Sequence, residues 1–432
     1  MKRRIHVPAA LALLLTSVLA AYPATAQDTP EPRLKLVFVE RFRFEAWDNA
    51  VNLDDASDDT FAYTRNRTTL GLRCLAAKNV EILGKVSNEF RVYLAPKDRA
   101  FNWHEIFFDN LHVKWTIPGR LPFTVTAGRQ DIDLGEGFVV ADGTPLDGSR
   151  SYYFNALRVD TDLSKSQKLI LFAHAQKTTD RFLPVINDRP QALAEQPEKG
   201  LALYYAGAFG KTKFDAYAIR KTTGETEVWP VPTRIDTFGA RAQAPVIRRL
   251  ALTAEGALQT GTYGAAGRSA FGGIFHFDYD FKGVLPLLKT AVVGGIYLSG
   301  DKPGTEKIEG WDPIFSRWPK WSEGYIYTFT RESRSAYWSN LTSLYASLVL
   351  DFGSRADGVL TVHRLGADET PAGEFPGGAG LDRGTLLKAR LNFTISETLT
   401  GHFIWEHFRP GDFYRPGASS YNWLRFELVF RY

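Results

Sequence analysis

The sequence predicts an all-β protein, a transmembrane antiparallel β-barrel of about 18 strands with short periplasmic turns and long extracellular loops. Three observations support this fold class: an amphipathic segment at residues 421–432, alternating segments along the whole chain, and connections that alternate between short and long. The composition stays even from end to end, without a linker or a low-complexity tract. One large unit is therefore expected rather than several soluble domains.

The segment at residues 421–432, YNWLRFELVFRY, is apolar on one face and charged on the other, because side chains alternate along a strand. The apolar face holds Leu424, Phe426, Leu428, Phe430 and Tyr432. The opposite face holds Trp423, Arg425, Glu427, Val429 and Arg431. A closed barrel with lipid outside and water inside suits this arrangement, and the terminal aromatic resembles the assembly signal of bacterial outer-membrane barrels. A half-buried edge strand of a soluble sandwich is the alternative that this segment alone leaves open.

The N-terminal residues have the features of a secretory signal peptide. Three basic residues precede an apolar stretch at residues 11–19, and small residues precede Gln27. Cleavage is expected after Ala26, so that residues 1–26 form the signal peptide and residues 27–432 form a single barrel domain. Secretion and the barrel pattern together predict the bacterial outer membrane as the location.

The composition also narrows the function classes. Without the signal peptide the chain is nearly neutral, so no nucleic-acid partner is expected. Cys74 is the one cysteine, which excludes a disulfide within the chain. No apolar run reaches the roughly 18 residues that a membrane-spanning helix requires. The HExxH and GxSxG motifs are missing, so no enzyme is predicted; an outer-membrane enzyme whose catalytic cluster forms only in space is the least favoured alternative.

Alternating or β-rich segments supply the expected strands. They lie at residues 33–47, 61–78, 80–94, 104–117, 122–130, 151–162, 167–178, 200–209, 212–222, 233–244, 249–261, 267–279, 287–299, 340–352, 356–367, 383–396, 398–409 and 421–432. Their connections are short at residues 78–79, 118–120, 210–211, 353–354 and 397–398, and long at residues 48–60, 131–150, 179–199, 300–339 and 366–383. Short turns at one rim and long loops at the other are typical of outer-membrane barrels, with both chain ends in the periplasm. Barrels of this size enclose an aqueous channel, so we expect a pore, and any plug must come from an outer loop.

Strand parity predicts which side chains line the pore. In the segment at residues 383–396 the apolar odd positions face lipid, which directs the even positions inward. The same argument predicts the basic lining Arg41, Arg43, Arg65, Arg67, Arg73, Arg91, Arg129, Arg158, Arg241, Lys388, Arg390 and Arg425. The predicted acids in the pore are Glu45, Glu89, Asp160, Glu255, Glu406 and Glu427. Arg129 follows Gly128, and its face is ambiguous because a bulge there would switch it.

Two interpretations of the arginines remain open at this stage. In the first, arginine and glutamate pairs only brace the wall, as in any porin. In the second, the arginines form a ladder for a polyanion, because guanidinium groups bind carboxylates bidentately and stay charged at any relevant pH. Interleaved acids would keep each site weak enough to release the solute, as conduction requires.

Four stretches of the chain carry a family resemblance. They are VTAGRQDIDLGEG at residues 125–137, Glu255 and Gln259 within LTAEGALQTG, Ser299-Gly300-Asp301 followed by Trp311-Asp312-Pro313-Ile314-Phe315, and HFIWEHFRPGDFY at residues 402–414 with the Arg425 strand after it. These stretches resemble the alginate export family of outer-membrane barrels, over essentially the whole mature chain. The resemblance implies an eighteen-stranded barrel that passes an anionic polysaccharide outward through an arginine-rich pore. Phe138 and Ser316 depart from the family pattern, where a basic residue and a proline are expected.

The expected function is therefore passive passage of an anionic, alginate-like polyuronate, in the export direction. The alternative is an uptake porin selective for small anions or sugars. The partners expected are outer-membrane lipid, the polysaccharide, the barrel-assembly machinery, and periplasmic export or degradation proteins. No cofactor is predicted. Two acidic stretches have two possible interpretations, as solvated loops or as structural Ca²⁺ sites: Asp131, Asp133 and Glu136 form one, and the loop at residues 54–59 forms the other.

The long connection at residues 300–339 is predicted to fold over or into the outer mouth of the pore. Its aromatic residues suit sugar rings and its basic residues suit carboxylates; they are Trp311, Trp318, Trp321, Arg317, Lys320, Arg331 and Arg334. An exposed loop without a role in the pore is the alternative.

Overall fold

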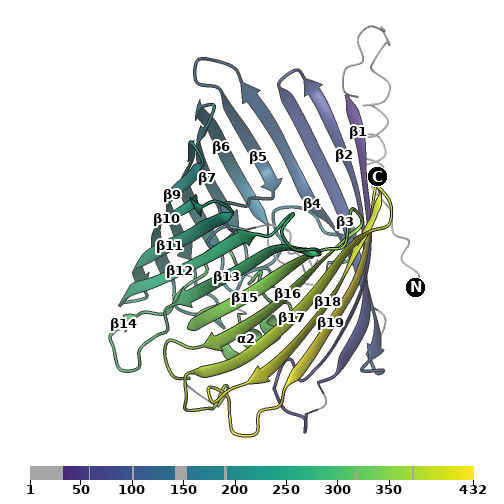
Figure 1. Cartoon of the computed structure of the whole chain (residues 1–432). Coiled ribbons are helices and arrows are strands. Elements are labelled where there is room, and N and C mark those ends of the chain that lie inside the picture. The colour runs from purple at the N-terminus through teal and green to yellow at the C-terminus, as the bar shows by residue number, and fades with distance from the viewer. Residues whose placement is uncertain are drawn as a thin grey trace, which may run out of the picture.

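The strands form one closed antiparallel sheet, which is the predicted barrel (Figure 1). The structure is a computed structural model that describes residues 33–57, 59–99, 102–141, 153–188, 192–317, 319–335, 337–371 and 374–432. The predicted signal peptide, residues 1–26, lies outside the described residues. The barrel closes because β1 (Leu34–Asp48) pairs both with β2 (Phe61–Ala77) and with β19 (Tyr421–Arg431).

The other long strands follow one another around the barrel in chain order. They are β3 (Val80–Ala95), β4 (Asn102–Ile117), β5 (Phe123–Gln130), β6 (Phe154–Ser164), β7 (Gln167–Gln176), β8 (Glu198–Phe209), β9 (Thr212–Thr223), β10 (Thr233–Ile247), β11 (Leu250–Tyr263), β12 (Ala266–Asp280), β13 (Leu288–Leu298), β15 (Leu341–Asp351), β16 (Ala356–Gly366), β17 (Asp382–Thr394) and β18 (Leu399–Pro410). The short strand β14 (Lys307–Ile308) pairs with the end of β12. Without β14, the 19-stranded sheet has eighteen barrel strands, as the sequence predicts.

The period-two pattern of the sequence explains the two faces of the wall. On β2, for example, the Leu70 side chain is 48% exposed on the outside, whereas Arg65 and Arg67 are buried inside. On β19, Leu424 faces outward, and Trp423 and Arg425 are buried. A one-residue slip would exchange the two faces, so the alternation fixes the register of each strand.

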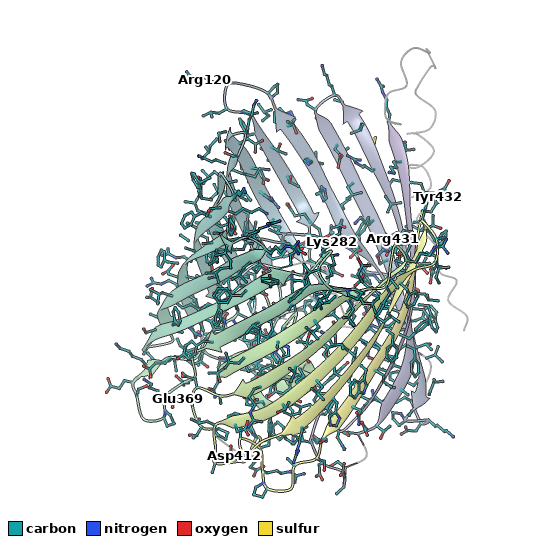
Figure 2. All side chains as sticks on the ribbon, viewed as in Figure 1. Arg120, Lys282, Glu369, Asp412, Arg431 and Tyr432 are labelled. Carbon is teal, nitrogen blue, oxygen red and sulfur yellow. The ribbon has the colours of Figure 1, made fainter. Side chains whose placement is uncertain are left out.

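The two rims of the barrel differ in the length of the connections between strands. The turns at residues 78–79, 165–166, 210–211 and 248–249 have two residues each, and most connections at the opposite rim are longer. Arg120 lies at the short-turn rim in Figure 2, and Glu369 and Asp412 lie at the long-loop rim. Two connections break the predicted alternation: the turn at residues 264–265 belongs to the long-loop rim, and residues 281–287 form a longer turn at the other rim. We call the two ends the inner rim (short turns) and the outer rim (long loops).

The outer surface of the wall is apolar. Large side chains such as Leu201, Phe238, Leu258 and Leu344 are each more than 50% exposed there, and such a band suits the hydrocarbon region of a bilayer. In the described part of the chain, no helix has the length and the apolar character needed to cross a membrane.

Two outer connections fold into the barrel. The inserted segment, residues 299–340, contains α2 (Tyr325–Ser333), which lies within the ring of strands in Figure 1. The shorter inner segment, residues 131–141, lies beside it. Apolar residues of both segments, including Ile132 and Tyr325, are fully buried in the same core as wall residues. The prediction that the long connection folds into the pore agrees with this arrangement.

Helix α2 forms because its buried residues recur at helical spacing. Tyr325, Thr328 and Phe329 lie on one buried face. The helix ends at Arg334, which has a left-handed backbone with φ of 63° and donates its backbone N–H to the Thr330 carbonyl oxygen (2.8 Å).

Candidate functional site: the narrowed interior of the barrel

The inserted segment is attached to opposite sides of the wall. Near its start, Asp312 forms an ion pair with Lys221 of β9, with 3.1 Å between Oδ1 and Nζ. Further along, Glu323 forms an ion pair with Arg425 of β19, with 3.0 Å between the nearest atoms. Because the segment is held at both places, it crosses the interior of the barrel.

One wall residue holds the tip of the inserted segment, residues 321–324. Glu406 of β18 accepts hydrogen bonds from the Ser322 hydroxyl (2.6 Å) and from the two backbone N–H groups that follow it (2.9 Å each). Lys388 of β17 lies 3.5 Å from the same carboxylate and donates to a carbonyl oxygen of the tip (3.2 Å). Charge-assisted hydrogen bonds of this kind are stronger than neutral ones, so the tip is firmly placed.

The shorter inner segment supports the inserted segment from the other side. Val140 and Phe315 form a parallel bridge between the two segments. The Ser316 hydroxyl donates to the Gly137 carbonyl oxygen (2.5 Å). Asp133 forms an ion pair with Lys320, at 3.5 Å. The two segments therefore act as one internal structure.

On the β1–β3 and β19 side, predicted arginines and acids form a buried ion-pair network. Arg65 donates from Nε to Glu89 (2.8 Å) and lies 3.6 Å from Glu45. Arg425 donates from Nε to Glu45 (2.9 Å) across the seam between β19 and β1. These side chains are less than 10% exposed, so mutual neutralisation compensates for the loss of their hydration.

Most of the other predicted cations also have a carboxylate partner. The further pairs are Arg41 with Glu89 (3.1 Å), Arg43 with Glu427 (2.6 Å), Arg67 with Asp109 (2.8 Å), Arg73 with Glu81 (2.6 Å), Arg158 with Asp160 (2.7 Å) and Arg241 with Asp215 (3.2 Å). Arg91 lies over the Tyr63 ring, 5.1 Å from its centroid. Glu255, a predicted acid, accepts a hydrogen bond from the Tyr217 hydroxyl (3.0 Å). The wall-bracing interpretation therefore describes much of this lining.

The structure resolves the ambiguity at Arg129. Gly128 has φ of 125°, a conformation that favours glycine, and both Thr126 and Arg129 are buried on the interior side. The Arg129 guanidinium donates to both carboxylate oxygens of Asp180 (2.6 and 3.0 Å) and lies 4.0 Å from the centroid of Tyr153. Arg129 is therefore an anchor for the connection at residues 177–197.

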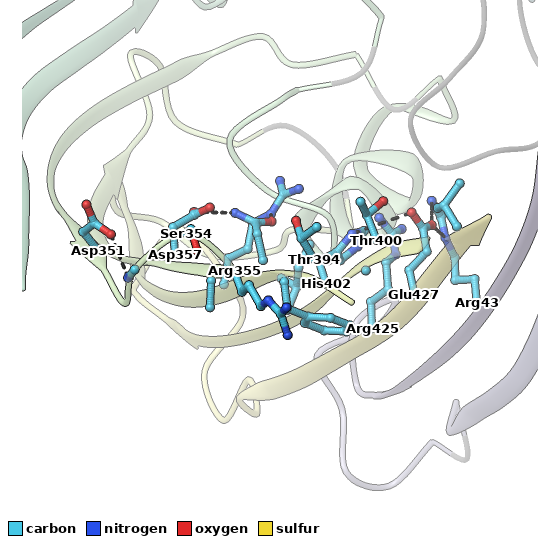
Figure 3. A pocket seen from close by; sticks show the side chains of 18 of the residues that line it. Arg43, Asp351, Ser354, Arg355, Asp357, Thr394, Thr400, His402, Arg425 and Glu427 are labelled. Carbon is cyan, nitrogen blue, oxygen red and sulfur yellow. Dashed lines mark hydrogen bonds and ion pairs between the residues drawn. The ribbon is translucent and has the colours of Figure 1, made fainter. Parts of the chain in front are cut away.

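Among the described residues, cavities lie between the internal structure and the wall, and two of them concern the predicted lining. A cavity of about 380 Å³ lies against β12–β17, and its lining includes Trp321, Tyr345 and Lys388. A second cavity of about 490 Å³ lies toward the inner rim. Its labelled side chains follow one another in a row from Asp351 on the left to Arg43 on the right in Figure 3. Arg390 lines both cavities and so lies between them.

Arg390 differs from the predicted arginines that are paired with a carboxylate. Its Nε donates to the Asn392 side-chain oxygen (2.7 Å). Among the described residues, no carboxylate oxygen lies within 4.0 Å of its guanidinium. The side chain is exposed to the interior. An uncompensated guanidinium between two cavities can attract and orient an anion that passes it.

The anchors of the inserted segment are ionised carboxylates. Burial acts to raise the pKa of Glu323, but the charges of Arg425 and Lys388 outweigh burial and hold that pKa below its ordinary value. Burial likewise acts to raise the pKa of Asp312, but Lys221 reverses the effect and lowers that pKa. Both carboxylates therefore stay charged below the pH at which a free acid would protonate.

The acidic stretches considered for Ca²⁺ have other partners. Asp54 forms an ion pair with Arg415 at 2.6 Å, and Asp59 accepts from the backbone of Asn49 (2.7 Å). Within the described ranges, no group of three or more His, Cys, Asp or Glu side chains is arranged to hold a metal ion.

Several important residues were not predicted from strand parity. Lys221 and Arg383 are buried, and Arg383 donates to both carboxylate oxygens of Glu332 on α2 (2.8 Å each). The sequence predicts Arg317 only as part of the long connection, and in the structure it donates to Glu198 of β8 (2.7 Å). Their partners are distant in sequence, so no local pattern identifies the contacts. Trp318, also predicted in this connection, lies outside the described residues.

No protein-family model matches the sequence, and no curated protein matches it either. The resemblance to the alginate export family therefore stays a prediction.

Solved structures share the fold. OpdK of Pseudomonas aeruginosa, crystallised with vanillate, has a TM-score of 0.60 and 12% identity, with 92% of this chain and 98% of that chain covered. OccK2 (OpdF) of P. aeruginosa, in complex with glucuronate, has a TM-score of 0.61 and 10% identity, with 94% and 99% covered. OccK11 (OpdR) of P. aeruginosa has a TM-score of 0.56 and 9% identity, with 92% and 95% covered. The chain therefore has the eighteen-stranded barrel fold found in these Pseudomonas structures, one of which is described as an outer-membrane protein.

Proposed function

We propose that this protein is an outer-membrane channel, not an enzyme, through which small anionic solutes diffuse passively. Lipid surrounds its apolar outer face, and the inner rim faces the periplasm. The observation that carries the proposal is Arg390, which has no carboxylate within 4.0 Å among the described residues and lines both internal cavities. Direction of transport follows the gradient of the solute.

The size of the open space favours small solutes over a polysaccharide. The inserted segment and the shorter inner segment occupy the middle of the barrel, and cavities of about 380 and 490 Å³ lie beside them. Sites of this size suit small molecules. The similar folds solved with vanillate and with glucuronate both hold small carboxylates. These observations favour the uptake-porin alternative over the export of an alginate-like polymer.

The charge of the open space favours anions. Lys388 and Arg390 stand two residues apart on β17 and line the same cavity. Aromatic side chains of Trp321 and Tyr345 line it as well. Aromatic faces and cations together suit a carboxylate carried on a flat or ring-shaped body.

Reversal potentials in planar bilayers under a salt gradient test the proposal. We expect the parent channel to prefer anions and R390Q to shift the reversal potential toward cations. Two charges 4 Å apart interact by about 4 kcal/mol at an effective dielectric of about 20, so even part of this attraction changes ion occupancy severalfold. R73Q is the matched control, because Arg73 also faces the interior but is already paired with Glu81.

Liposome-swelling rates identify the solute class. Glucuronate should enter faster through the parent than through R390Q, and glucose should enter both at the same rate. A parent channel that prefers cations, or that admits glucuronate no better than R390Q does, would overturn the proposal. Strong block of the current by polyuronate chains, without entry of glucuronate, would instead favour passage of an anionic polysaccharide.

A further inference from the structure

The outer surface of the wall carries a basic cluster where lipid is expected. The basic cluster consists of Lys199 on β8, Arg220 on β9 and Arg234 on β10. We infer that it binds the phosphorylated sugar head of a lipid A-type glycolipid in the outer leaflet. The inference rests on the proposed outer-membrane location and not on the solute of the channel.

The side chains of the cluster point away from the pore. Arg220 lies between Ile219 and Lys221, which are 2% and 1% exposed inside the barrel. Arg234 precedes Ile235, which is fully buried inside. Because side chains alternate along a strand, both arginines face outward. Their side chains are 55% and 54% exposed.

Lys199 is placed outward by the same alternation. It stands two residues before Leu201, which is 51% exposed on the outer surface. Its neighbour Glu198 is buried and faces Arg317 inside the barrel. Lys199 itself is exposed.

Strand register brings the three cations together at the outer rim. Lys199 and Arg234 are both paired with Thr222 of β9, one on each side. Arg220 stands two residues before Thr222 on the same face of β9. Neighbouring strands are roughly 5 Å apart, so the cations surround Thr222 within reach of a single phosphate group.

The charge of the cluster is not balanced by the wall. Asp236 lies 2.5 Å from Arg220 and 3.5 Å from Arg234, and it is shared between them. Lys199 has no ion-pair partner among the residues that the structure describes. Three cations thus face one carboxylate, and an excess positive charge at a membrane boundary attracts anionic head groups.

An apolar row lies directly beneath the cluster, on the side of the membrane centre. Register connects its members across five strands, and they are Leu203, Ala218, Phe238, Leu258 and Phe271. Four of them are large apolar side chains that are 44–58% exposed. Phosphate contacts above an apolar band match a lipid whose acyl chains enter the membrane while its phosphates stay at the surface. A soluble phosphate would use only the upper half of this surface.

Lipid binding to the full-length barrel in detergent tests the inference. Titrations use lipid A with its phosphates, the same lipid after dephosphorylation, and inorganic phosphate alone. We expect the parent to prefer phosphorylated lipid A, and the triple variant K199Q/R220Q/R234Q to bind it about tenfold or more weakly. The control variant R181Q/K302Q/K307Q removes three exposed cations from outer connections and should bind as the parent does.

Several outcomes of these titrations would contradict the inference. Equal binding by the triple variant and the parent, or equal binding of dephosphorylated lipid A, would overturn the inference. So would binding of inorganic phosphate as tightly as lipid A, which would assign the cluster to a free anion. Heat-modifiable migration shows that the variants are folded. Fractionation of cells tests the proposed location, and unchanged reversal potentials in the triple variant keep the channel proposal independent of this result.

Discussion

Arg65 and Arg390 point into the same barrel but have opposite surroundings. Arg65 is buried between Glu45 and Glu89, with its Nε 2.8 Å from Glu89. Arg390 is exposed beside an uncharged partner, Asn392. At the scale of single residues, the neighbours of an arginine decide whether carboxylates of the wall compensate its charge or the charge stays open to the interior.

We expect R65Q to destabilise the barrel and to change its ion preference little. The substitution removes one cation from a buried network, while Glu89 keeps Arg41 and Glu45 keeps Arg425, so we expect a cost of roughly 3 kcal/mol, at the low end for a broken buried ion pair. The temperature at which the folded band is lost in heat-modifiability gels measures the effect. The double variant R65Q/E89Q should be less stable still, because it also removes the carboxylate that lies 3.1 Å from Arg41. A stable R65Q barrel with altered selectivity would instead place Arg65 on the solute path.

Parity predicted the inward direction of these arginines because alternation is a local property of a strand. Their partners were not predictable in the same way. Arg67 meets Asp109 of β4, which depends on the register between neighbouring strands. Arg129 meets Asp180, which depends on the course of an outer connection and on the conformation of Gly128. The sequence of a single strand predicts neither the register with its neighbour nor the course of a distant connection.

At the scale of elements, the inserted segment occupies the interior of the barrel, and we expect it to limit the conductance. Glu406 holds its tip through three hydrogen bonds. We expect E406Q to release the tip, because an amide oxygen accepts more weakly than a carboxylate and its NH₂ group opposes the donors of the tip. Single-channel recordings should show a larger and noisier conductance. E81Q, at the inner end of β3, is the control and should conduct as the parent does.

Excision of residues 305–335 should give the largest conductance of all variants, because it removes most of the inserted segment. The same bilayer recordings measure it. If conductance stayed at the parental value in a folded barrel, the segment would not be the constriction.

The ion pair between Glu323 and Arg425 predicts a pH dependence. The pKa of Glu323 is held below its ordinary value, so docking of the tip is stabilised at neutral pH and lost as pH falls through that lowered pKa. Conductance should stay constant down to about pH 4, near the ordinary value for glutamate, and rise only below it. E323Q should show the raised conductance already at neutral pH. A rise in the parent near pH 6 would exclude Glu323 as the controlling group.

Sequence reasoning found this element but not its structure. The length of the connection and its aromatic and basic residues indicated an insertion into the mouth of the pore. Helix α2 and the contacts of Asp312 and Glu323 were not predicted, since each depends on a wall residue that is close only after the barrel has closed.

At the scale of the whole molecule, closure depends on the last strand. Phe430 is paired with Glu40 of β1 and with Leu399 of β18. Deleting residues 430–432 should prevent assembly, because unpaired backbone groups at an open edge are costly in lipid. Heat-modifiable migration and outer-membrane fractionation measure the result. Deleting residues 302–304 from an outer connection is the control and should leave a closed barrel.

The eighteen-stranded architecture was predictable because two simple regularities repeat along the chain. Side chains alternate within each strand, and connection lengths alternate between the rims, apart from residues 264–265 and 281–287. The solute was not predictable in this way. It depends on the space left beside the inserted segment and on which cations lack a carboxylate, and both are properties of the assembled interior.

Arg425 has a consequence for the order of assembly. It donates to Glu45 across the seam where the last strand meets the first, and it also holds Glu323 of the inserted segment. One guanidinium group therefore contacts both the first strand, at the seam that closes the barrel, and the segment that occupies the interior. If the barrel closed with the segment outside, Arg425 would lack its ion pair with Glu323. The seam between β19 and β1 is therefore more stable when the segment lies inside the barrel. We therefore expect closure of the barrel and placement of the inserted segment to stabilise each other through Arg425.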